Sequence, residues 1–466
     1  MDYLQIVKLI FAILTLIMTL LLVHFVVFAI VGLFARKKFP KTDKKLKYGI
    51  IIPARNEAAV VGNLIKSVYK NKYPQDKLHV FVIAHNCTDD TAEISRDLGA
   101  TVYEYNNPNE CTMGYAFRYL FDRIREDYGV ENYDGFFLFN ADNVLAEDYF
   151  DKMNDAFVAN GEKQVITSFR NSKNFGSNVM SAMYGIYFVQ GCRYESRGRT
   201  VCGCSTRVQG TGYVIPSEIV KDGWQYVTLT EDWEFSADQI IRNRKIVYCD
   251  EAVFYDEQPT TVHIMLRQRL RWAKGHLLVC LTRYGDLLKG IFASKKRGGG
   301  RYKGSLYDMS INILPICVIS FVLFAAQVIC LGLTPLFGFG AAEITKLWID
   351  WAIGVGFSAA GFYLLNLLGG MVILIAEHKR IKNAGAGVLT GALLLWPIFI
   401  ALSVPLELAC LFVKVGWKAI PHDDTTTFEQ VNDVAATDAA VDTDLTDGDD
   451  VDSDCEPDMP DDKVDG

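Results

Sequence analysis

The sequence lacks three features that would place it in other classes of protein. Its eleven cysteines are an odd number and form no paired framework, which excludes a small fold held together by disulfides. Cys202 and Cys204 form a lone Cys-x-Cys without a second pair, so reduced thiols are predicted there rather than a zinc site. The apolar segments carry no ionisable residue near their middle apart from His24 and Glu407, which argues against a transporter or channel.

Negative charge is concentrated at one end of the chain, which has a formal net charge of -8 over 466 residues. The segment 423–466 holds about 17 acidic side chains and one lysine, so roughly -16 belongs to it and the remainder lies near +8. A basic body suits an anionic bilayer surface and a phosphate-bearing substrate, although the positive-inside bias of a membrane protein also explains much of it. The acidic tail, 416–466, is rich in Asp and Thr and is predicted to be disordered.

Half of the residues are hydrophobic, and the longest apolar runs lie on either side of a polar middle. The first run fills most of residues 1–35 and is too long for a signal-peptide core, so it predicts a transmembrane helix. Basic residues crowd the segment 36–47 that follows, which places that flank in the cytoplasm and the N-terminus outside.

The second apolar region, 307–415, is predicted to form three transmembrane helices. They are expected near 307–334, 347–376 and 386–415. The basic, amphipathic segment 276–306 before them is predicted to lie on the cytoplasmic leaflet. Four spans after an outside N-terminus would put the tail outside, whereas Lys414 and Lys418 favour the inside, so the side of the tail stays open.

The polar middle, residues 36–275, alternates short apolar runs with stretches of helical spacing. Strands are predicted at 48–53, 78–83, 101–105 and 135–139, and helices at 57–70, 91–98 and 113–128. This order predicts a doubly wound parallel sheet, in which ligands bind at the carboxyl ends of the strands.

Four polar clusters lie at or near strand ends or turns. They are Pro53-Ala-Arg-Asn-Glu57, Asn86-Cys-Thr-Asp-Asp-Thr91, Asn140-Ala-Asp142-Asn143, and Thr230-Glu231-Asp232 with Gln268-Arg-Leu-Arg-Trp272. The second is also typical of a helix N-cap formed by Thr88 or Asp89. Asp142 is well placed for Mg²⁺ or Mn²⁺, which takes carboxylate and phosphate oxygens. Arg271 can pair with a diphosphate and Trp272 can stack on a sugar, although Trp272 could equally anchor an interfacial helix.

Taken together, the clusters resemble the inverting glycosyltransferases of family 2, in the membrane-embedded branch with cellulose, hyaluronan and poly-N-acetylglucosamine synthases and ceramide glucosyltransferases. The resemblance runs over roughly 48–275, and Thr230-Glu231-Asp232 and Gln268-x-x-Arg271-Trp272 are its most specific motifs. It implies an α/β GT-A fold, the Rossmann-like fold of nucleotide-diphospho-sugar transferases, in a cytoplasmic domain beside transmembrane α-helices. It also implies a UDP-sugar donor and a Mg²⁺ or Mn²⁺ ion.

The resemblance further implies roles for individual residues. The donor would be bound by Pro53, Asn56, Glu57, Asn86, Asp89, Asn140 and Asp142, with Asp142 as the metal ligand. Asp232 would be the general base, with Glu231 and Arg271 beside it as catalytic residues. The acceptor and pyrophosphate side would be lined by Gln209, Gly210, Gln268, Arg271 and Trp272.

Three positions depart from the family pattern. His85 stands where the family usually has Asp, Asn140 replaces the first Asp of Asp-x-Asp, and Thr112-Met113-Gly114 stands where many relatives carry Gly-Lys-Gly. These departures keep a non-catalytic membrane scaffold that binds nucleotide sugars as an alternative.

The expected function is transfer of a sugar from a UDP-sugar to a polysaccharide or lipid-linked acceptor, with inversion and a β-linkage. Processive polysaccharide synthesis is favoured over a non-processive glycolipid glycosyltransferase. The expected partners are the donor, the acceptor and the bilayer, with a homo-oligomer or an export partner to enlarge the pore and no nucleic acid. The expected location is the plasma membrane, multi-pass, with a cytoplasmic catalytic domain.

Overall fold

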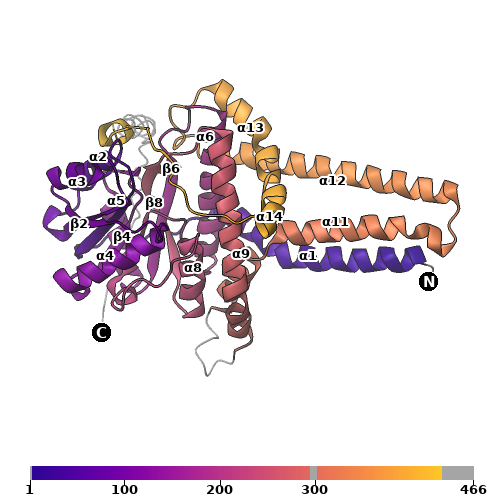
Figure 1. The fold of residues 1–466 in the computed structure, drawn as a ribbon, viewed down its shortest axis with the longest axis horizontal. Coiled ribbons are helices and arrows are strands. Elements are labelled where there is room, and N and C mark those ends of the chain that lie inside the picture. Colours follow the sequence, from indigo (N-terminus) through magenta and orange to yellow (C-terminus); the bar gives the residue numbers. More distant parts are fainter. Residues whose placement is uncertain (1–2, 294–301, 433–466) are drawn as a thin grey trace, which may run out of the picture.

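The computed structural model describes residues 3–293 and 302–432, and its centre is an eight-stranded sheet with helices on both faces (Figure 1). The strands are β1 Tyr48–Ala54, β2 Leu78–His85, β3 Thr101–Tyr105, β4 Gly135–Leu138, β5 Val144–Leu145, β6 Val165–Ser172, β7 Tyr213–Pro216 and β8 Ile246–Asp256. Their order across the sheet is β3-β2-β1-β4-β7-β6-β8-β5.

The two halves of the sheet differ in strand direction. β3, β2, β1 and β4 run parallel, as the sequence predicts. In the other half, β7 is antiparallel to both of its neighbours, β6 is parallel to β8, and β5 is antiparallel to β8, so the sheet as a whole is mixed. The carboxyl ends of β1, β2 and β4 therefore lie at one edge, and the polar clusters that follow these strands lie near one another there.

Helices cover the sheet and extend away from it on one side (Figure 1). They are α1 Tyr3–Phe34, α2 Val61–Tyr69, α3 Thr91–Asp97, α4 Met113–Asp127, α5 Tyr149–Ala159, α6 Val179–Gln190, α7 Gly198–Val201, α8 Glu231–Ile241, α9 Val262–Phe292, α10 Lys303–Asn312, α11 Ile316–Gly332, α12 Ala341–Ala376, α13 Ala386–Ala401 and α14 Ser403–Phe412. α6 continues through a π-helical turn, Gly191–Arg197, into α7.

Alternation along the central strands builds a core on both faces of the sheet. In β1, Ile50 and Ile52 pack into the cluster formed with α2 and α5, whereas Ile51 packs into the cluster on the other face with α4 and α8. All three side chains are fully buried, which is why the strand is a continuous apolar run in the sequence.

Within residues 3–293 and 302–432, three helices are long and apolar enough to cross a membrane: α1, α12 and the α13–α14 segment, Ala386–Phe412. The pair α10 and α11, bent by 60°, would make a fourth candidate if it is taken as one span. α1, α11 and α12 extend together from the sheet domain (Figure 1). Their far ends meet, because the Tyr3 hydroxyl donates to the Cys330 carbonyl (2.8 Å) and the Tyr3 ring stacks on Phe337.

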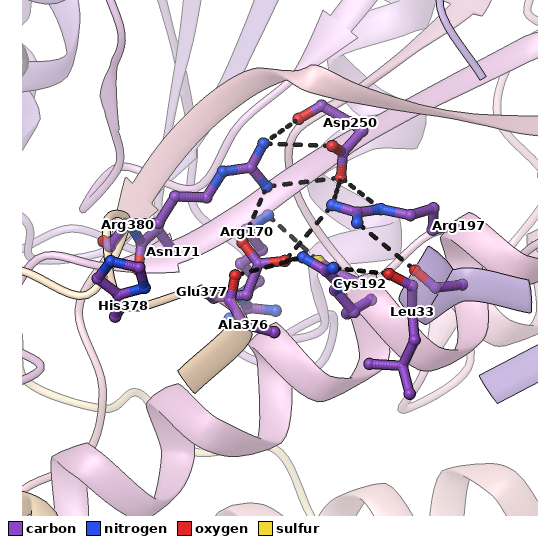
Figure 2. Close-up of polar contacts among 12 residues, drawn as sticks. Leu33, Arg170, Asn171, Cys192, Arg197, Asp250, Ala376, Glu377, His378 and Arg380 are labelled. Carbon is purple, nitrogen blue, oxygen red and sulfur yellow. Dashed lines mark hydrogen bonds and ion pairs between the residues drawn. The ribbon is translucent and has the colours of Figure 1, made fainter. Parts of the chain in front are cut away.

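A cluster of buried ion pairs joins these helices to the sheet domain (Figure 2). Asp250 on β8 accepts hydrogen bonds from Arg197 of the π-helical turn (2.6 Å) and from Arg380, which follows α12 (3.2 Å). Arg193 donates to the Leu33 carbonyl at the end of α1 (2.8 Å) and pairs with Glu377 at the end of α12. Arg380 and Arg197 lower the pKa of Asp250 despite its burial, so the carboxylate is held charged between two arginines.

Both ends of the α13–α14 segment are tied to the sheet domain. Before α13, Asn171 on β6 donates to the Arg380 carbonyl (2.7 Å). After α14, residues 413–432, here called the strap, run back along the domain (Figure 1), where Arg267 donates to the Ala419 carbonyl (2.9 Å). The sequence assigns residues 416–432 to a disordered tail, whereas the structure packs them on the domain; the rest of the predicted tail, 433–466, lies outside the described residues.

Candidate active site

One cavity has a volume of about 140 Å³ and lies where the carboxyl ends of β1, β2 and β4 face the strap. It is here called the donor cavity, because residues predicted to bind the donor line it. Its wall on the side of the sheet includes Pro53, Arg55, Glu57, His85, Met113, Asn140 and Asp142. Its wall on the side of the strap consists of Trp417, Lys418, Ala419, Ile420 and His422. Four of the predicted donor residues, Pro53, Glu57, Asn140 and Asp142, therefore line one cavity.

The other three predicted donor residues hold loops in place instead of lining the cavity. Asn56 and Asn86 follow β1 and β2 with φ of 58° and 54°, a left-handed conformation that asparagine tolerates better than most residues. The Asn56 side chain accepts from the Thr88 backbone (2.8 Å), and the Asn86 side chain accepts from the Asn107 backbone (2.7 Å).

Asp89 also has its carboxylate occupied by local contacts. Its Oδ1 accepts from the Thr91 hydroxyl (2.6 Å), and its Oδ2 accepts from the Ala58 backbone (3.1 Å). Asp89 thus joins the start of α3 to the loop after β1, and its Oδ1 also accepts from the Thr91 backbone (3.2 Å). The N-cap position of α3 is Asp90, whose side chain makes no capping hydrogen bond.

Asp142 and Asn140 present oxygen atoms to the donor cavity. Asp142 is buried, and its carboxylate accepts from the Glu257 backbone (2.8 Å) and from the Asn143 side chain (3.2 Å). The Asn140 Oδ1 is buried without a hydrogen-bond partner in the described part of the chain. Oxygen ligands of this kind suit Mg²⁺ or Mn²⁺, and donor phosphates would complete the coordination because these ions usually bind one or two protein carboxylates.

Two histidines on the donor cavity differ in charge. Burial, with a smaller effect from Arg55, lowers the pKa of His85, which leaves that imidazole neutral at pH 7. Burial also opposes charge on His422, but the Asp142 and Glu57 carboxylates outweigh it and raise its pKa to about 9. His422 therefore carries a positive charge against Glu57, with 3.0 Å between the ring nitrogen and the carboxylate.

A second cavity of about 140 Å³ adjoins the first. It is here called the acceptor cavity, because the residues predicted for the acceptor side line it. Its wall includes Arg170, Tyr187, Phe188, Arg207, Gln209, Gly210, Glu231, Asp232, Trp233, Gln268, Arg271, Trp272 and His276. The two cavities share five residues, Met113, Asn140, Gln268, Arg271 and Trp417. The structure thus brings every predicted acceptor-side residue to one cavity, next to the cavity that contains Asp142.

Asp232 lies in the first turn of α8, with Thr230 at the position before the helix. Gly210, in a left-handed conformation (φ 82°), lies against its carboxylate. Burial raises the pKa of Asp232, while the Trp233 backbone N–H and Arg271 oppose that rise. Burial and the nearby Asp232 charge also raise the pKa of Glu231. This pair of carboxyls is poised to hold a proton at a higher pH than free carboxyls do.

α9 can approach Asp232 because of a glycine. A side chain at Gly275 would place its Cβ 2.4 Å from the Thr230 hydroxyl, so any larger residue would push α9 away from the start of α8. Arg271 fixes the same contact by donating to the Leu229 carbonyl (2.7 Å). Gln268, Arg271 and Trp272 are spaced i, i+3 and i+4, which places all three on the face of α9 that lines the cavities.

The far side of the acceptor cavity is aromatic. The Trp272 ring lies 6.2 Å from Tyr187 in a stacked arrangement and 6.1 Å from Phe188, both on α6. Arg170 packs over the Phe188 ring and donates to the Gln209 carbonyl (2.9 Å), which holds the loop with Gly210 in place. Flat aromatic faces beside polar groups are suited to bind a sugar ring.

Sequence reasoning missed several residues of the two cavities. They are Arg55, Arg170, Tyr187, Phe188, Arg207, Trp233 and His276, together with Trp417, Lys418, Ile420 and His422 of the strap. Arg55 lies inside a motif that the sequence did single out. No local pattern marks the strap, since only the fold brings it to the ends of the parallel strands.

Comparison with known proteins gives a family match over the sheet domain. Residues 46–275 match the family described as Glycosyltransferase like family 2. The poly-beta-1,6-N-acetyl-D-glucosamine synthase of Staphylococcus epidermidis is 22% identical over 260 residues, which is 55% of this chain and 61% of that protein. The beta-monoglucosyldiacylglycerol synthase of Nostoc sp. is 25% identical over 291 residues, 59% of this chain and 58% of that protein. The match thus spans about three fifths of each of these relatives' length.

Among solved structures, the mannosyltransferase PcManGT from Pyrobaculum calidifontis, in complex with GDP-Man and Mn2+, superimposes with a TM-score of 0.50. The similarity covers 79% of this chain and 98% of that chain at 15% sequence identity, so it bears on the fold alone. Together with the family match, it confirms the predicted GT-A fold with its Rossmann-like core.

Proposed function

Residues 46–275 belong to glycosyltransferase family 2, and from this premise we propose that the chain transfers a sugar from a UDP-sugar to a polysaccharide or lipid-linked acceptor with inversion. The observation that carries the proposal is the meeting of the two cavities at Gln268 and Arg271. Asp142 lies on the donor side of that junction and Asp232 lies on the acceptor side. A donor and an acceptor bound in the two cavities would thus present their reacting atoms to one another.

The reaction follows from the charges at this junction. An acceptor hydroxyl in the second cavity gives its proton to the Asp232 carboxylate as its oxygen attacks the anomeric carbon. The bond between that carbon and the diphosphate oxygen breaks, and its electron pair leaves with the diphosphate. Arg271 stabilises the charge that develops on the leaving group. One direct displacement inverts the anomeric centre, so an α-linked donor gives a β-linkage.

A divalent cation fits the donor side of the site. Asp142, with the unpartnered Asn140 oxygen, would hold the ion, which when bound supplies positive charge to the donor diphosphate. Asp142 is kept in its orientation by the Glu257 backbone N–H and Asn143.

The contacts of the helix ends support a membrane protein with its catalytic domain in the cytoplasm. The basic segments 36–47 and 378–382 both lie on the side of the sheet domain, as the positive-inside bias requires. α1, α11 and α12 would each cross the bilayer. α13 and α14 start and end at the sheet domain and pack against α6 and α9, so they would lie along the cytoplasmic interface without crossing.

A lipid-linked acceptor is favoured over a growing polymer by one further observation. His276 lines the acceptor cavity and also a cleft of about 70 Å³ between α9, α11 and α14. Apart from Asn312 and Glu407, that cleft is lined mainly by apolar side chains, including Leu277, Leu314 and Leu411. A hydrocarbon chain could reach the acceptor cavity by this route. The glycolipid synthase among the relatives supports this choice.

Release of UDP from membranes that contain the full chain tests the proposed transfer. A panel of UDP-sugars, with GDP-mannose as a comparison donor, is supplied with Mn²⁺ or Mg²⁺, and Asp232→Asn is run beside the wild type. We expect metal-dependent release with one UDP-sugar and a loss of about 10²–10⁴-fold in the variant. The exposed Asp222, which lines neither cavity, provides the matched control Asp222→Asn.

The outcomes of this experiment distinguish a transferase that uses Asp232 as its base from a non-catalytic scaffold. Release that is unchanged in Asp232→Asn would remove Asp232 as the base. No release with any donor, although UDP binds, would support the non-catalytic scaffold instead. The acceptor class is read from the labelled product: a glycolipid extracts into organic solvent, whereas a polysaccharide stays in the aqueous phase and grows with time.

A further inference from the structure

His276 is the side chain that the acceptor cavity shares with the cleft between α9, α11 and α14. It lies four residues after Trp272 on the same face of α9, about 6 Å further along the helix. Gln268 and Arg271, which border the donor cavity, lie at the opposite end of this row. An acceptor that reaches from the junction of the two cavities into the cleft therefore passes His276.

The His276 imidazole is available for hydrogen bonds at this point. Its ring packs on the Trp233 ring of α8 with 4.0 Å between the ring centres, and neither ring nitrogen has a hydrogen-bond partner within residues 3–293 and 302–432. Burial, with smaller effects from Arg207 and Arg271, lowers the pKa of His276 to about 3, so the ring is neutral at pH 7. A neutral imidazole donates one hydrogen bond and accepts another, which suits a hydroxyl, ester or amide group.

The cleft contains a second polar group without a partner. The Oε2 atom of Glu407 on α14 is buried and has no hydrogen-bond partner in the described part of the chain. A buried polar atom of this kind is costly, so a ligand that donates a hydrogen bond to it would be bound favourably. Most of the other side chains that line the cleft are apolar: Ala273, Leu277, Ile313, Leu314, Pro315, Val318 and Leu411.

Space for a hydrocarbon chain continues beyond the cleft towards α1. Asn312, at the end of α10, lines both the cleft and a cavity of about 330 Å³. Phe25 and Phe28 of α1 contribute apolar surface to that cavity. The cleft is much smaller, about 70 Å³, which suits a short polar linkage beside His276 and Glu407. The chain attached to that linkage would then lie against α1.

The charges along this route disfavour an anionic ligand. Among the described residues, no lysine or arginine lines the cleft. Arg199, in the cavity beyond the cleft, is already paired with Asp308 (2.7 Å). Lys274 of α9 donates to the Cys410 carbonyl (2.8 Å) and does not line the cleft. A phosphate in the cleft would thus meet the Glu407 carboxyl without a cation to offset its charge.

We propose that His276 and Glu407 bind the polar linkage of a lipid acceptor and select an uncharged lipid alcohol over a lipid phosphate. The linkage is the part of the lipid between its reacting hydroxyl and its hydrocarbon chain. This inference rests on the proposed function, because the ligand it assigns is the acceptor of that transfer. His276 takes no proton in the reaction; it holds the acceptor so that its hydroxyl lies near Asp232.

Transfer to two lipids with the same hydrocarbon chains tests the selectivity. The full-length protein in phosphatidylcholine vesicles is supplied with the UDP-sugar that the donor panel identifies and with dioleoylglycerol or dioleoyl phosphatidic acid. We expect a labelled product with dioleoylglycerol, and at least about tenfold weaker competition by phosphatidic acid. Transfer to phosphatidic acid with equal efficiency would overturn the proposal.

Substitution of His276 tests its contact with the acceptor. His276→Phe keeps a ring on Trp233 but removes both nitrogens, so the KM for dioleoylglycerol should rise by about threefold to tenfold. UDP affinity should change by less than about twofold. His263→Phe is the matched control, because His263 is exposed on the same helix and lines neither cavity nor the cleft. An unchanged KM for dioleoylglycerol, or an equal loss for donor and acceptor, would overturn the role of His276.

Conservative variants distinguish hydrogen bonding from packing. His276→Asn and His276→Gln place an amide near the positions of Nδ1 and Nε2, and one of them should recover most of the acceptor affinity. No recovery in either variant would mean that His276 only packs α9 on α8. Glu407→Gln should reduce the preference for dioleoylglycerol over phosphatidic acid, because it removes the negative charge from the cleft. An unchanged preference would exclude Glu407 from the selection.

The result can be told apart from failure of the proposed function. If the wild type extends a water-soluble polysaccharide but transfers to no lipid, the lipid site is wrong while the transferase stands. If a photoreactive dioleoylglycerol crosslinks to α9 or α14 in the wild type and less in His276→Phe, but no donor releases UDP, the lipid site stands and the transferase is wrong.

Discussion

The donor cavity and the acceptor cavity have similar volumes, but their walls are built in different ways. The acceptor cavity is enclosed by helices and by a loop that Arg170 holds, and α9 is packed onto α8 through Gly275. The donor cavity is bounded on one side by strand-end loops and on the other by the strap. One cavity is therefore part of the packed fold, whereas the other is completed by a segment held by hydrogen bonds and ion pairs, some exposed and some partly buried.

In the proposed transfer, this difference between the walls would separate the handling of the donor from that of the acceptor. A packed wall favours a fixed orientation of the acceptor hydroxyl relative to Asp232, which a direct displacement requires. A wall that can open favours exchange of a charged nucleotide, since a fully closed donor site would trap UDP after transfer. Substitutions at the junction should affect both substrates, and substitutions within one wall should affect only one.

Arg271 lines both cavities, so its loss should have the largest effect. Arg271→Ala is expected to lower kcat by about 10²–10³-fold because the leaving diphosphate loses a charge that stabilises it. Arg271→Lys should recover part of the rate. Steady-state release of UDP measures the effect, with Lys289→Ala as a control at an exposed position on the same helix. A rate within threefold of the wild type, as an order-of-magnitude threshold, would remove Arg271 from the mechanism.

The pH dependence of kcat/KM should report the ionisation of Asp232, which lies on the acceptor side. Burial raises its pKa above the usual value of about 3.9, and the base acts only when it is ionised. Activity is therefore present above the raised pKa and falls about tenfold per pH unit below it. We expect the acid limb of kcat/KM at a higher pH than a free aspartate would give. Thermal unfolding in the same buffers checks that the fold persists, and an acid limb at or below the usual aspartate range would contradict the assignment.

Substitution of Trp272 should affect acceptor binding but not donor binding, because Trp272 lines the acceptor cavity and is absent from the lining of the donor cavity. Trp272→Ala is expected to raise the KM for the acceptor by about tenfold, since an aromatic face beside the sugar is lost. UDP affinity should change by less than about twofold. Equal losses for donor and acceptor would show that the cavities do not act separately.

The ion pair between Lys70 and Glu429 should give the smallest effect, because both side chains are half exposed. Glu429→Lys is expected to weaken UDP binding by less than about fivefold, and the difference should shrink as salt is added. The double variant Lys70→Glu with Glu429→Lys restores the pairing and should restore the affinity. A larger effect that persists in high salt would mean that the strap is held in another way.

Much of the half of the sheet that borders the donor cavity could be predicted from the sequence, because the patterns that indicate it are local. The apolar runs of β1, β2, β3 and β4 gave parallel strands, and each polar motif lies directly after or close to its strand end. The motif around Asn86 was ambiguous between capping and ligand binding, and in the structure Asp89 contacts Thr91 and Ala58 and lines neither cavity. The mixed direction of the second half could not be predicted, because strand pairing between β7 and its neighbours depends on contacts distant in sequence.

The family match of residues 46–275, the GT-A fold and the residues that line the acceptor cavity were within reach of the sequence by itself, because short motifs such as Thr230-Glu231-Asp232 and Gln268-x-x-Arg271-Trp272 carry them in fixed order. Only the tertiary structure decided that α13 and α14 return to the sheet domain and that the strap closes the donor cavity. Hydropathy gives the apolar character of a segment, but it does not say on which side of the membrane each end of the segment lies. That choice depends on ion pairs and hydrogen bonds formed with residues hundreds of positions away, such as Glu57 with His422.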